Sequence, residues 1–572
     1  MEPILTYSNP DPVMVDLLAK ALDCHPILAA LLLNRGIDNI SDASCFLNPT
    51  LEQLIDPFEL KDMNKAVGRI YTAVLNKEKI LIFGDFDADG VTATALLYDF
   101  LEHCDANVCW YVPHRIKEGY SLSLDHIAMA VDQNIDLIIT VDCGVSSHIA
   151  IDQAIQEDID VIVTDHHEPD IDMDLPRALA VINPKRKDCP SGLAHLAGVG
   201  VAFFLVMALR KHFRDHQFWE TIKEPNLVDY LDLFVIGTIG DMVPLMNENR
   251  ALCIAGFNRI RQGKRPGLKA LAQVSRIDFS RMDSDDISFK IVPRINAAGR
   301  LSHARICVSQ LTDTSIVNTE KNASLLDELN VKRQKIEQQI VESIEHRLVQ
   351  NPGLLESNLL FLWDEFWDPS VLGIAASKLC RKYYIPVILL SCKGEHDAIG
   401  SGRSINDINI YHALKHCDSL IEKFGGHAMA AGLTVKKENL APLCQKLNAY
   451  IESTYSPMDF QKSMVIDAVL DLDDITFELA GEIDRLRPFG TANPEPVFVS
   501  ENIQVVSSFI MGANHRKMIL KKASSPNGQC IEAFHFNVKD PNNQPDYFPK
   551  IIFKLKVNKF KNAAAQIIIE DL

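Results

Sequence analysis

Short apolar runs in this sequence end repeatedly on acidic residues or histidines. Four such runs are KILIFGDFDADG (79–90), DLIITVDCG (136–144), VIVTDHH (161–167) and LDLFVIGTIGD (231–241). The polar residues at their ends are Asp85, Asp87, Asp89, Asp142, Asp165, His166, His167 and Asp241. Carboxylates and imidazoles are the side chains that bind divalent metals and transfer protons. The first hypothesis is therefore metal-assisted or acid–base chemistry.

These residues need elements that bring them together. Helical spacing separates the four runs, as in AIDQAIQEDI at 150–159. Alternation of this kind predicts a parallel α/β sheet in which all four runs are strands. Ligands of open parallel sheets bind beyond the carboxyl ends of the strands. We therefore expect the polar residues to lie at one edge of one sheet.

Carboxylates crowded at one edge repel each other unless cations lie among them. A pair of divalent ions removes this conflict, with Mg²⁺ or Mn²⁺ suited to carboxylates and an imidazole favouring Mn²⁺. Two such ions catalyse phosphoester hydrolysis. Taken singly, a strand-end aspartate is more often a cap or turn residue, and a His–His pair is more often surface or core. A calcium loop at DFDADG would need an acidic residue where Leu96 stands.

Composition limits the class of protein. A chain of 572 residues is too long to fold around a single hydrophobic core. Its content of 47% hydrophobic and 23% charged residues is ordinary for a globular protein. The 13 cysteines never form CxxC, which indicates reduced thiols and a cytoplasmic location. No membrane span or secretory signal is expected. The net charge of −19 counts against nucleic acid unless basic residues cluster locally.

The motifs GDFDADGVTAT, VDCG, TDHH and GTIGD resemble the four motifs of the DHH phosphoesterase superfamily. Further segments resemble the RecJ family of bacterial single-strand-specific DNA exonucleases, and the resemblance spans nearly the whole chain. These segments are RGIDNISDASCFLNPTLEQLIDPFELKDM (35–63), VPHRIKEGY (112–120), VPRINAAGRL (292–301), GSGRS (400–404), KFGGHAMAAGL (423–433) and LRPFGTANPEPVF (486–498).

The resemblance implies roles for individual residues. One metal would be held by Asp87 and a bridging Asp142, with Asp85 as a further ligand where smaller superfamily members have a histidine at the position of Phe83. The ligands of the other metal would be Asp89, Asp142, His166 and Asp241. His167 would face the scissile phosphate, and Asp165 would support a histidine. The residues expected to contact DNA or its reacting phosphate are Arg115, Tyr120, Arg294, Asn296, Arg300, Ser401, Arg403, Ser404 and His427.

The resemblance also implies a multidomain α/β architecture. We expect a helical cap (1–50), a parallel-sheet DHH domain (51–312), a long linking helix (313–352), an α/β DHHA1 domain (353–465) and a C-terminal β-barrel of the OB-fold type (466–572). ILAALLLNRG is predicted to be an amphipathic helix that ends at Gly36, and GSGRS and FGGH are predicted to be glycine-rich turns.

Basic residues gather around 515–522 and 554–561 of the last segment, although the chain as a whole is acidic. Lysines, arginines and phenylalanines alternate there, which suits single-stranded DNA. The residues are Arg516, Lys517, Lys556, Lys521, Lys522, Lys554, Lys559, Lys561, His515, Phe534, Phe536 and Phe560. A second basic stretch, 259–265, is a candidate channel lining. A barrel with a solvated lysine face is the plainer alternative.

Three positions depart from the family pattern. Asp368-Pro369-Ser370 follows Trp367 where the family has His-x-Gly, and Ser121 and Ala492 stand where it has glycine. Loss of the histidine is expected to alter a substrate contact.

The expected function is 5′→3′ exonuclease hydrolysis of single-stranded DNA to mononucleotides with two Mn²⁺ or Mg²⁺ ions, in recombination and repair with a helicase and a single-strand-binding protein. One alternative is a DHH-family phosphoesterase acting on short oligonucleotides or small phosphorylated molecules. Another is a replication scaffold without activity. Removal of 466–572 is expected to weaken binding to longer strands.

Overall fold

The structure is a computed structural model that describes residues 3–170, 173–525, 527–542, 545–558 and 564–571. The chain forms two compact units, one consisting mainly of Ser324–Met464 and the other mainly of Leu5–Ile295 and Val465–Leu572. Among the described residues, none of the helices combines the length and apolar character that a membrane-spanning helix requires.

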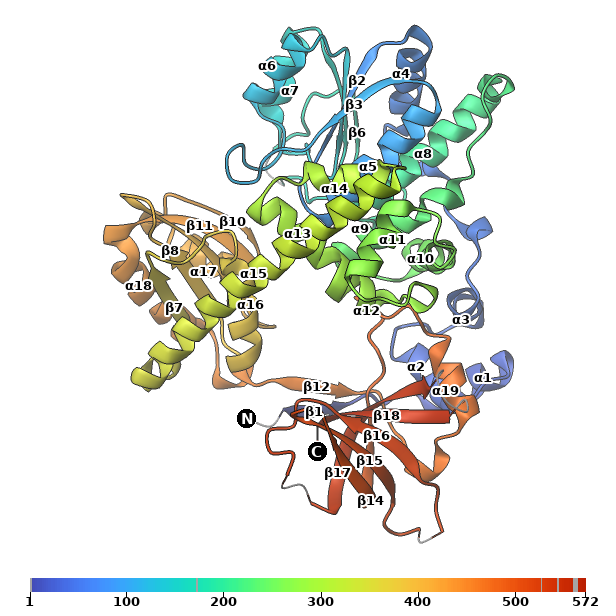
Figure 1. The fold of residues 1–572 in the computed structure, drawn as a ribbon, viewed down its shortest axis with the longest axis vertical. Helices are drawn as coiled ribbons and strands as arrows, with labels where there is room; N and C mark the ends of the chain where they lie inside the picture. The colour runs from blue at the N-terminus through green and yellow to red at the C-terminus, as the bar shows by residue number, and fades with distance from the viewer. Residues whose placement is uncertain (1–2, 171–172, 526, 543–544, 559–563, 572) are drawn as a thin grey trace. The chain divides into compact units, whose positions relative to one another are not determined.

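The larger unit contains a five-stranded parallel sheet in the order β3-β2-β4-β5-β6 (Figure 1). Its strands are β2 (Lys79–Gly84), β3 (Asn107–Tyr111), β4 (Leu137–Val141), β5 (Asp160–Thr164) and β6 (Ala180–Ile182). The intervening helices are α5 (Ala88–His103), α6 (Leu124–Asp132) and α7 (His148–Gln156). The predicted parallel sheet is confirmed. Because the chain reverses its direction of travel across the sheet between β2 and β4, a ligand site is expected beyond these two strands.

The run 231–241 is not a strand, and this prediction was wrong. Leu231–Gly240 forms the helix α9, and Asp241 is its C-cap residue. Nine of its ten residues are buried, and a short run that is apolar throughout has no periodicity to distinguish a buried helix from a buried strand. Other helices of this unit are α4 (Met63–Asn76), α8 (Gly198–Asp215), α10 (Asn247–Ile260), α11 (Pro266–Val274) and α14 (Arg305–Thr312).

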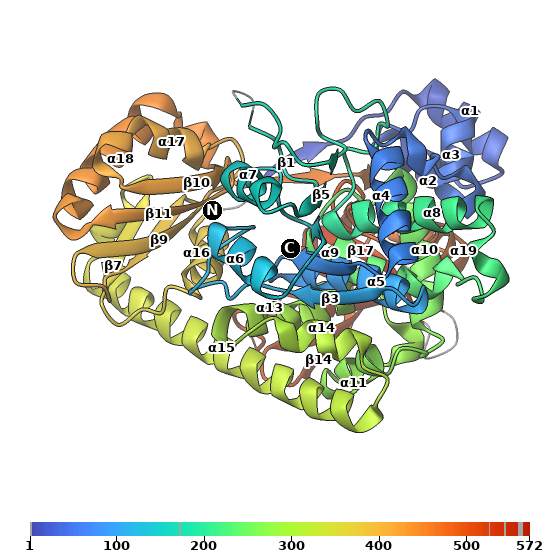
Figure 2. The ribbon, with the colours of Figure 1, turned by 90° about the horizontal axis from the view of Figure 1, so that it is seen from above.

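A helical stretch leads from this unit into the long helix. It consists of α12 (Ser284–Asp286), the π-helical turn η6 (Ile287–Ile291) and α13 (Val292–Leu301). Helix α15 (Ile316–Gln350) then runs without a break, as Figure 2 shows. The long helix was predicted, and its residues Ile340, Ile344 and Leu348 are buried.

The smaller unit is built on a second five-stranded sheet in the order β10-β11-β9-β8-β7. The bounds are β7 (Leu360–Asp364), α16 (Leu372–Tyr383), β8 (Val387–Ser391), β9 (Asp397–Arg403), α17 (Ile410–His416), β10 (Lys423–His427), β11 (Ala430–Lys436) and α18 (Leu440–Thr454). GSGRS and FGGH therefore lie largely in β9 and β10, and their prediction as turns was wrong. A Cβ at Gly400 would lie 2.6 Å from the side chain of Leu390 on the paired strand β8, and a Cβ at Gly402 would lie 2.6 Å from that of Ile410 on α17. Close packing therefore explains these glycines.

The C-terminal segment closes into a five-stranded barrel, as predicted. Its strands are β14 (Phe498–Met511), β15 (His515–Lys522), β16 (Ile531–His535), β17 (Tyr547–Asn558) and β18 (Ala564–Asp571). Pairing of β14 with both β15 and β17 closes the sheet. The short strand β13 (Ala468–Val469) joins it alongside β14.

The helical cap shares one hydrophobic core with the barrel. Cap helices α1 (Pro12–Leu22), α2 (Pro26–Leu33) and α3 (Ile40–Leu47) pack with α19 (Phe477–Asp484) and the barrel strands. Helix α2 was predicted to be amphipathic and to reach Gly36. It ends at Leu33, three residues earlier. Its residues 28–32 are all buried, because the helix packs against both the other cap helices and the barrel.

Candidate metal centre and nucleic-acid interface

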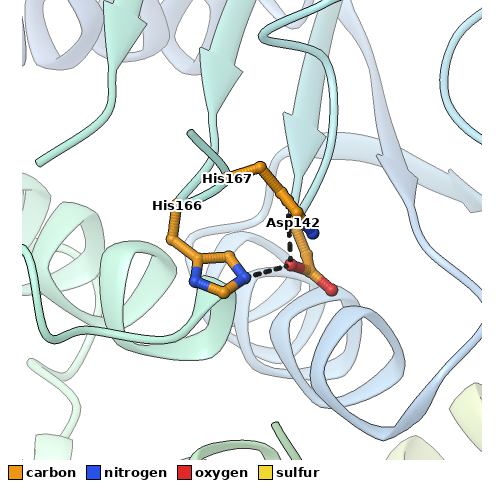
Figure 3. Close-up of side chains that lie close together, drawn as sticks. All are labelled: Asp142, His166 and His167. Atoms are coloured by element: carbon orange, nitrogen blue, oxygen red, sulfur yellow. Dashed lines mark ion pairs between the residues drawn. The ribbon is translucent and has the colours of Figure 1, made fainter. Parts of the chain in front are cut away.

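The predicted metal ligands lie where the parallel strands end. Asp85 and Asp87 follow β2, Asp142 follows β4, and His166 follows β5. Asp89 lies in the first turn of α5 and Asp241 at the end of α9. Figure 3 shows His166 and His167 both directed toward Asp142. One sheet edge and one helix end therefore gather side chains that are far apart in the sequence.

These side chains form overlapping groups of possible metal ligands. Asp85, Asp87 and Asp142 offer oxygens within 4.8 Å of one another, and so do the ligand atoms of Asp89, His166 and Asp241. His166 Nε2 lies 3.1 Å from Asp142 Oδ1, 3.6 Å from Asp241 Oδ2 and 3.8 Å from Asp89 Oδ2. All six predicted ligands are thus close together, with Asp142 positioned between the two groups as a bridging ligand would be. Their roles in coordination stay predictions.

The electrostatics of the cluster fit bound cations. Burial, reinforced by the neighbouring carboxylates, raises the pKa values of Asp85, Asp89 and Asp142 well above the usual range. Burial followed by the charge of Asp87 raises the pKa of Asp241 to about 7. Divalent ions among these carboxylates would allow all of them to ionise at neutral pH.

Unsatisfied atoms point to the same conclusion. Asp85 Oδ1, Asp142 Oδ1 and His166 Nε2 are buried and make no hydrogen bond to any residue that the structure describes. Such atoms are rare in folded proteins unless something else satisfies them. Burial, with the charge of His167, lowers the pKa of His166 to about 3. His166 is therefore neutral at physiological pH, the form in which imidazole binds a metal.

Backbone groups orient two of the carboxylates. The N–H groups of Gly198 and Val199, at the start of α8, donate to the two oxygens of Asp89 at 2.6 and 2.8 Å. Asp142 adopts a left-handed φ of 60°, and a Cβ at Gly198 would lie 2.5 Å from its Cβ. A Cβ at Gly237 would similarly lie 2.9 Å from Asp89 Oδ1. Sequence reasoning missed these glycines, since only the fold brings them to the ligands.

His167 is held mainly by Asp165, and its Nδ1 also lies 3.9 Å from Asp142 Oδ1, within reach of the ligand groups. Asp165 Oδ1 lies 2.7 Å from His167 Nδ1. Asp165 also accepts hydrogen bonds from the N–H groups of Val145 at 2.9 Å and His166 at 2.7 Å, and it is buried. Burial lowers the pKa of His167, but the hydrogen bond and charge of Asp165 outweigh it and raise the value to about 9. His167 is therefore protonated at neutral pH, and 45% of its side chain is exposed.

Arg115 and Tyr120 lie beside the metal-binding segment. The guanidinium of Arg115 is 4.8 Å from the centre of the Phe86 ring. The Tyr120 ring packs edge-on against Phe86 and His167, and its hydroxyl is 3.3 Å from His167 Nδ1. Arg294 is one turn into α13 and donates to the Lys290 carbonyl oxygen at 2.7 Å. These three residues belong to the same compact unit as the ligands.

The remaining predicted DNA contacts belong to the smaller unit. Arg403 donates to Ser401 Oγ at 2.9 Å, and Ser404 Oγ donates to the Ile408 carbonyl oxygen at 2.7 Å. Arg300 donates to the Ser370 carbonyl oxygen at 3.1 Å. The others are Asn296 on α13 and His427, whose Nδ1 accepts from the Met429 N–H at 3.3 Å.

The predicted basic residues of the barrel carry internal partners. Arg516 donates to Ser508 Oγ at 2.8 Å, and Lys517 and Lys556 form ion pairs with Glu532 and Glu495. Lys559, Phe560 and Lys561 lie outside the described residues. Sequence reasoning missed the partners because they are distant along the chain or on a facing strand.

The basic stretch 259–265 contributes both to the fold and to a cleft, since Arg261 is exposed and lines one. Its role as a channel lining stays a prediction. Arg265 forms ion pairs with Asp99 at 2.8 Å and Asp232 at 2.7 Å, and only 13% of its side chain is exposed. Arg259 pairs with Asp229 at 3.0 Å. These two arginines of the stretch, both half-buried, therefore connect neighbouring helices through ion pairs.

Comparison with protein families matches three segments of the chain. The DHH family N-terminal domain matches residues 79–238, the DHHA1 domain 356–453 and the RecJ OB domain 466–571. The three segments correspond to the parallel sheet, the second sheet and the barrel. The sequence-based expectation of these three domain types is confirmed.

Whole-chain comparisons agree with the family matches. The single-stranded-DNA-specific exonuclease RecJ of Bacillus subtilis (strain 168) is 36% identical, over 98% of this chain and 70% of that protein. The protein of the same name in Escherichia coli (strain K12) is 35% identical over 96% of each. Among solved structures, RecJ of Thermus thermophilus in complex with Mn²⁺ is similar with a TM-score of 0.82, 26% identity and coverage of 99% of this chain and 79% of that one. A Mg²⁺ complex of that protein gives a TM-score of 0.74 at 25% identity, with 99% and 78% coverage.

Proposed function

The chain belongs to the RecJ family, and we propose that it is a metal-dependent exonuclease that hydrolyses single-stranded DNA from the 5′ end and releases mononucleotides. The observation that carries this proposal is the convergence of Asp85, Asp87, Asp89, Asp142, His166 and Asp241. Solved RecJ structures with Mn²⁺ and with Mg²⁺ support divalent ions of this kind as cofactors, and the overlapping groups of ligand atoms favour a pair of them. The 5′→3′ direction rests on the family resemblance.

The protein's own residues divide the chemical work. Bound divalent ions supply a nucleophile from water at neutral pH and offset the charge of the phosphate. His167, cationic below about pH 9, faces outward from Asp165 and donates a hydrogen bond to a phosphate oxygen as negative charge grows there. Asp165 fixes the ring orientation and places the proton on Nδ1.

Positioning of the strand is assigned to cationic and polar groups around this centre. Arg115 and Tyr120 would hold the 5′-terminal phosphate, because both pack on the segment that carries Asp85 and Asp87. Arg294 would hold the DNA backbone from the start of α13. Guanidinium groups suit this task because they bind phosphate oxygens in pairs. The remaining proposed contacts are Asn296, Arg300, Ser401, Arg403, Ser404 and His427.

The barrel distinguishes this proposal from a phosphoesterase that acts on small molecules. A small substrate needs no extended surface beyond the metal centre, whereas residues 466–571 match the RecJ OB domain. Stacked Phe534 and Phe536, with ring centres 6.3 Å apart and planes 10° from parallel, offer a surface for bases. We place the enzyme in the cytoplasm, in recombination and repair, with a helicase and a single-strand-binding protein as partners.

Hydrolysis of 5′-phosphorylated single-stranded DNA with added Mn²⁺ tests the proposal. We expect mononucleotides from the single strand and little product from blunt duplex, RNA or pyrophosphate. Asp142→Asn should lower turnover by on the order of a hundred- to a thousand-fold, because a bridging ligand stabilises both metal positions. DNA binding should be retained.

The matched control is Asp132→Asn, which removes a carboxylate from an exposed position on α6 and should leave turnover unchanged. Full activity of Asp142→Asn, or undiminished hydrolysis after chelation of divalent metals, would refute the metal assignment. Preference for pyrophosphate over DNA would favour the small-molecule alternative.

A further inference from the structure

One row of side chains crosses the barrel with one residue from each strand. In the strand register, Phe509 pairs with Lys517, Lys517 with Phe534, Phe534 with Ile568 and Ile568 with Lys554. The side chains of this row point away from the core, since the row's neighbours along the strands include buried Met518 and Ala533. Phe509 is 61% exposed. Lys517 Nζ lies 5.5 Å from the centre of the Phe534 ring. Two lysines therefore share one surface row with two phenylalanines and an isoleucine.

The next row leads into a cleft. Its register runs Ile519, Glu532, Gln566 and Lys556. Gln566 and Lys556 line a cleft of about 860 Å³ that lies within the larger unit. The basic residues that line the cleft are Arg261, Arg281, Lys290, Arg485, Arg487 and Lys556.

The cleft also adjoins the helical stretch that leads toward the metal ligands. Asp286 and Lys290 line it from the end of α12 and from η6. Val292, the first residue of α13, packs against Gly240, where a Cβ would lie 3.3 Å from its side chain. Gly240 immediately precedes Asp241. Lys290, which lines the cleft, therefore lies two residues from Val292, which packs against the glycine before Asp241.

Carboxylates already pair with several cations of this surface. Lys517 pairs with Glu532, and Lys554 pairs with Glu570 at 3.0 Å. Lys290 pairs with Asp286 at 2.7 Å. Because these pairs are partly exposed to water, they add little to the stability of the fold. Their presence on the surface assigned to DNA calls for a different explanation.

Glu495 has a central place among these acids. It belongs to the segment NPEP (493–496), which the proposed function left without a role. Its carboxylate pairs with Lys556 and, at 3.6 Å, with Arg487. Only 16% of its side chain is exposed. Glu495 thus contributes to neutralising one cation from the barrel and one from the segment before it, where Arg487 also pairs with Asp484 at 2.6 Å.

We propose that these carboxylates, Glu495 above all, stand in for DNA phosphates, so that a single strand binds by exchanging with them. The inference rests on the proposed function and adds to it how the strand is held. Each phosphate that leaves a cation is replaced by a carboxylate that stays attached to the protein. The strand is therefore held weakly enough to advance after each nucleotide is removed, while the cations stay in place.

The test is the affinity of the full-length protein for a single strand whose 5′-terminal linkages resist hydrolysis, measured with Mg²⁺ by fluorescence anisotropy. Glu495→Gln should bind about three- to ten-fold more tightly than the unaltered protein at low salt. Glu532→Gln should bind more tightly by a smaller factor. The gain should shrink as salt is raised, since the competition is electrostatic.

Asp152→Asn is the matched control, because it removes the same charge from the exposed pair of Asp152 with Arg177 on α7 and should leave affinity unchanged. Unchanged or weaker binding by both glutamine variants would overturn the inference. If Glu495→Gln unfolds at a lower temperature than the unaltered protein, the DNA affinities of Glu532→Gln and Glu570→Gln decide whether the inference holds. Failure of the unaltered protein to bind or degrade single-stranded DNA would instead refute the proposed function.

Discussion

At the scale of single residues, the cluster consists largely of carboxylates that repel one another unless cations lie among them. Asp89 and Asp142 are almost completely buried. Asp142 also adopts a left-handed φ, which costs a non-glycine residue about 1–2 kcal/mol. Neither feature helps the folded chain by itself. The free energy of metal binding would offset both costs, so we expect the metal-free site to lower the stability of the fold.

Asp165→Asn tests how His167 acts. Asparagine keeps the size of the side chain but removes the charge that raises the pKa of His167. The pKa should then fall from about 9 toward or below the ordinary value, because burial still lowers it. We expect turnover to fall by about 10- to 100-fold at pH 8, with metal affinity nearly unchanged, as measured by single-turnover hydrolysis and metal titration.

The sign of the pH effect makes this prediction specific. In the unaltered protein the cationic donor is present below about pH 9 and is lost as pH rises through that value. In Asp165→Asn the loss should begin at lower pH, so the defect should be smaller at pH 6 than at pH 8. An equal defect at both values would show that Asp165 acts only on ring orientation.

At the scale of elements, the features predicted best were those that depend on residues close together in the sequence. Asp85, Asp87 and Asp89 follow a strand within a few residues, so the spacing along the chain was sufficient to place them at the strand's end. The helix α9 was mistaken for a strand because a run that is buried on all sides has no polar face. Asp241 still reaches the cluster, since a helix that packs on α5 and α8 can bring its C-terminus to the same place.

Features that depend on contacts between distant segments could not be predicted. Gly198 and Gly237 are ordinary glycines in the sequence, and only the packing of α8 and α9 shows that a methyl group there would collide with Asp142 and Asp89. The ion pairs of Arg265 and the partners of Lys556 join residues from separate elements. Periodicity reports which face of an element is buried but not which charged group it meets.

Ala492→Gly is predicted to stabilise the protein. Ala492 stands where the family resemblance places glycine, and its φ is 61°. Relief of the left-handed strain exceeds the extra freedom that glycine gives the unfolded chain, so we expect a gain of about 0.5–1 kcal/mol. Ser121, with a φ of 71°, is the parallel case near the metal site. Calorimetric unfolding temperatures measure the gain.

A glycine substitution without such strain provides the control for Ala492→Gly. Ala523 lies in an exposed turn at negative φ and donates its N–H to the Asn502 carbonyl oxygen at 2.7 Å. Ala523→Gly should lower the unfolding temperature slightly, because only the unfolded chain gains freedom. Equal shifts for the two variants would show that backbone strain at Ala492 does not limit stability.

At the scale of the whole molecule, metal binding and folding should be linked through pH. Asp241 has a folded pKa of about 7 against about 3.9 in an unfolded chain. Between these values the metal-free folded protein binds the additional proton, so its stability falls as pH rises from about 4 to 7. Mn²⁺ binds the ionised form and competes with that proton. Mn²⁺ should therefore raise the unfolding temperature more at pH 8 than at pH 5.5.

The expected size of this effect follows from the binding equilibrium. A hundred-fold excess of free metal over its dissociation constant stabilises the folded state by about 2.7 kcal/mol. Asp241→Asn should flatten the pH dependence of the metal-free protein and reduce the Mn²⁺ shift at pH 8. An equal Mn²⁺ shift at both pH values in the unaltered protein would contradict the linkage.

The cap and the barrel should depend on each other for stability. Buried Leu28, Leu31 and Leu32 of the cap share their core with Leu470 and Phe553. Arg250 adds a polar connection, since its buried guanidinium donates to the carbonyl oxygens of Phe46, Arg485 and Leu486 at 2.7–2.9 Å. Burial, with the charge of Arg35, lowers the pKa of Arg250 to about 9. A buried cation of this kind becomes costly when any of its acceptors is removed.

Truncation therefore tests more than DNA binding. Removal of 466–572 exposes several leucines of the cap, each worth about 1.5–3 kcal/mol when buried, and deprives Arg250 of two acceptors. We expect this chain to unfold at a lower temperature and to aggregate, as size-exclusion chromatography would show. Removal of both 1–50 and 466–572 should restore a monodisperse protein with metal-dependent hydrolysis of short strands. A singly truncated chain as stable as the full one would show that the cap folds without the barrel.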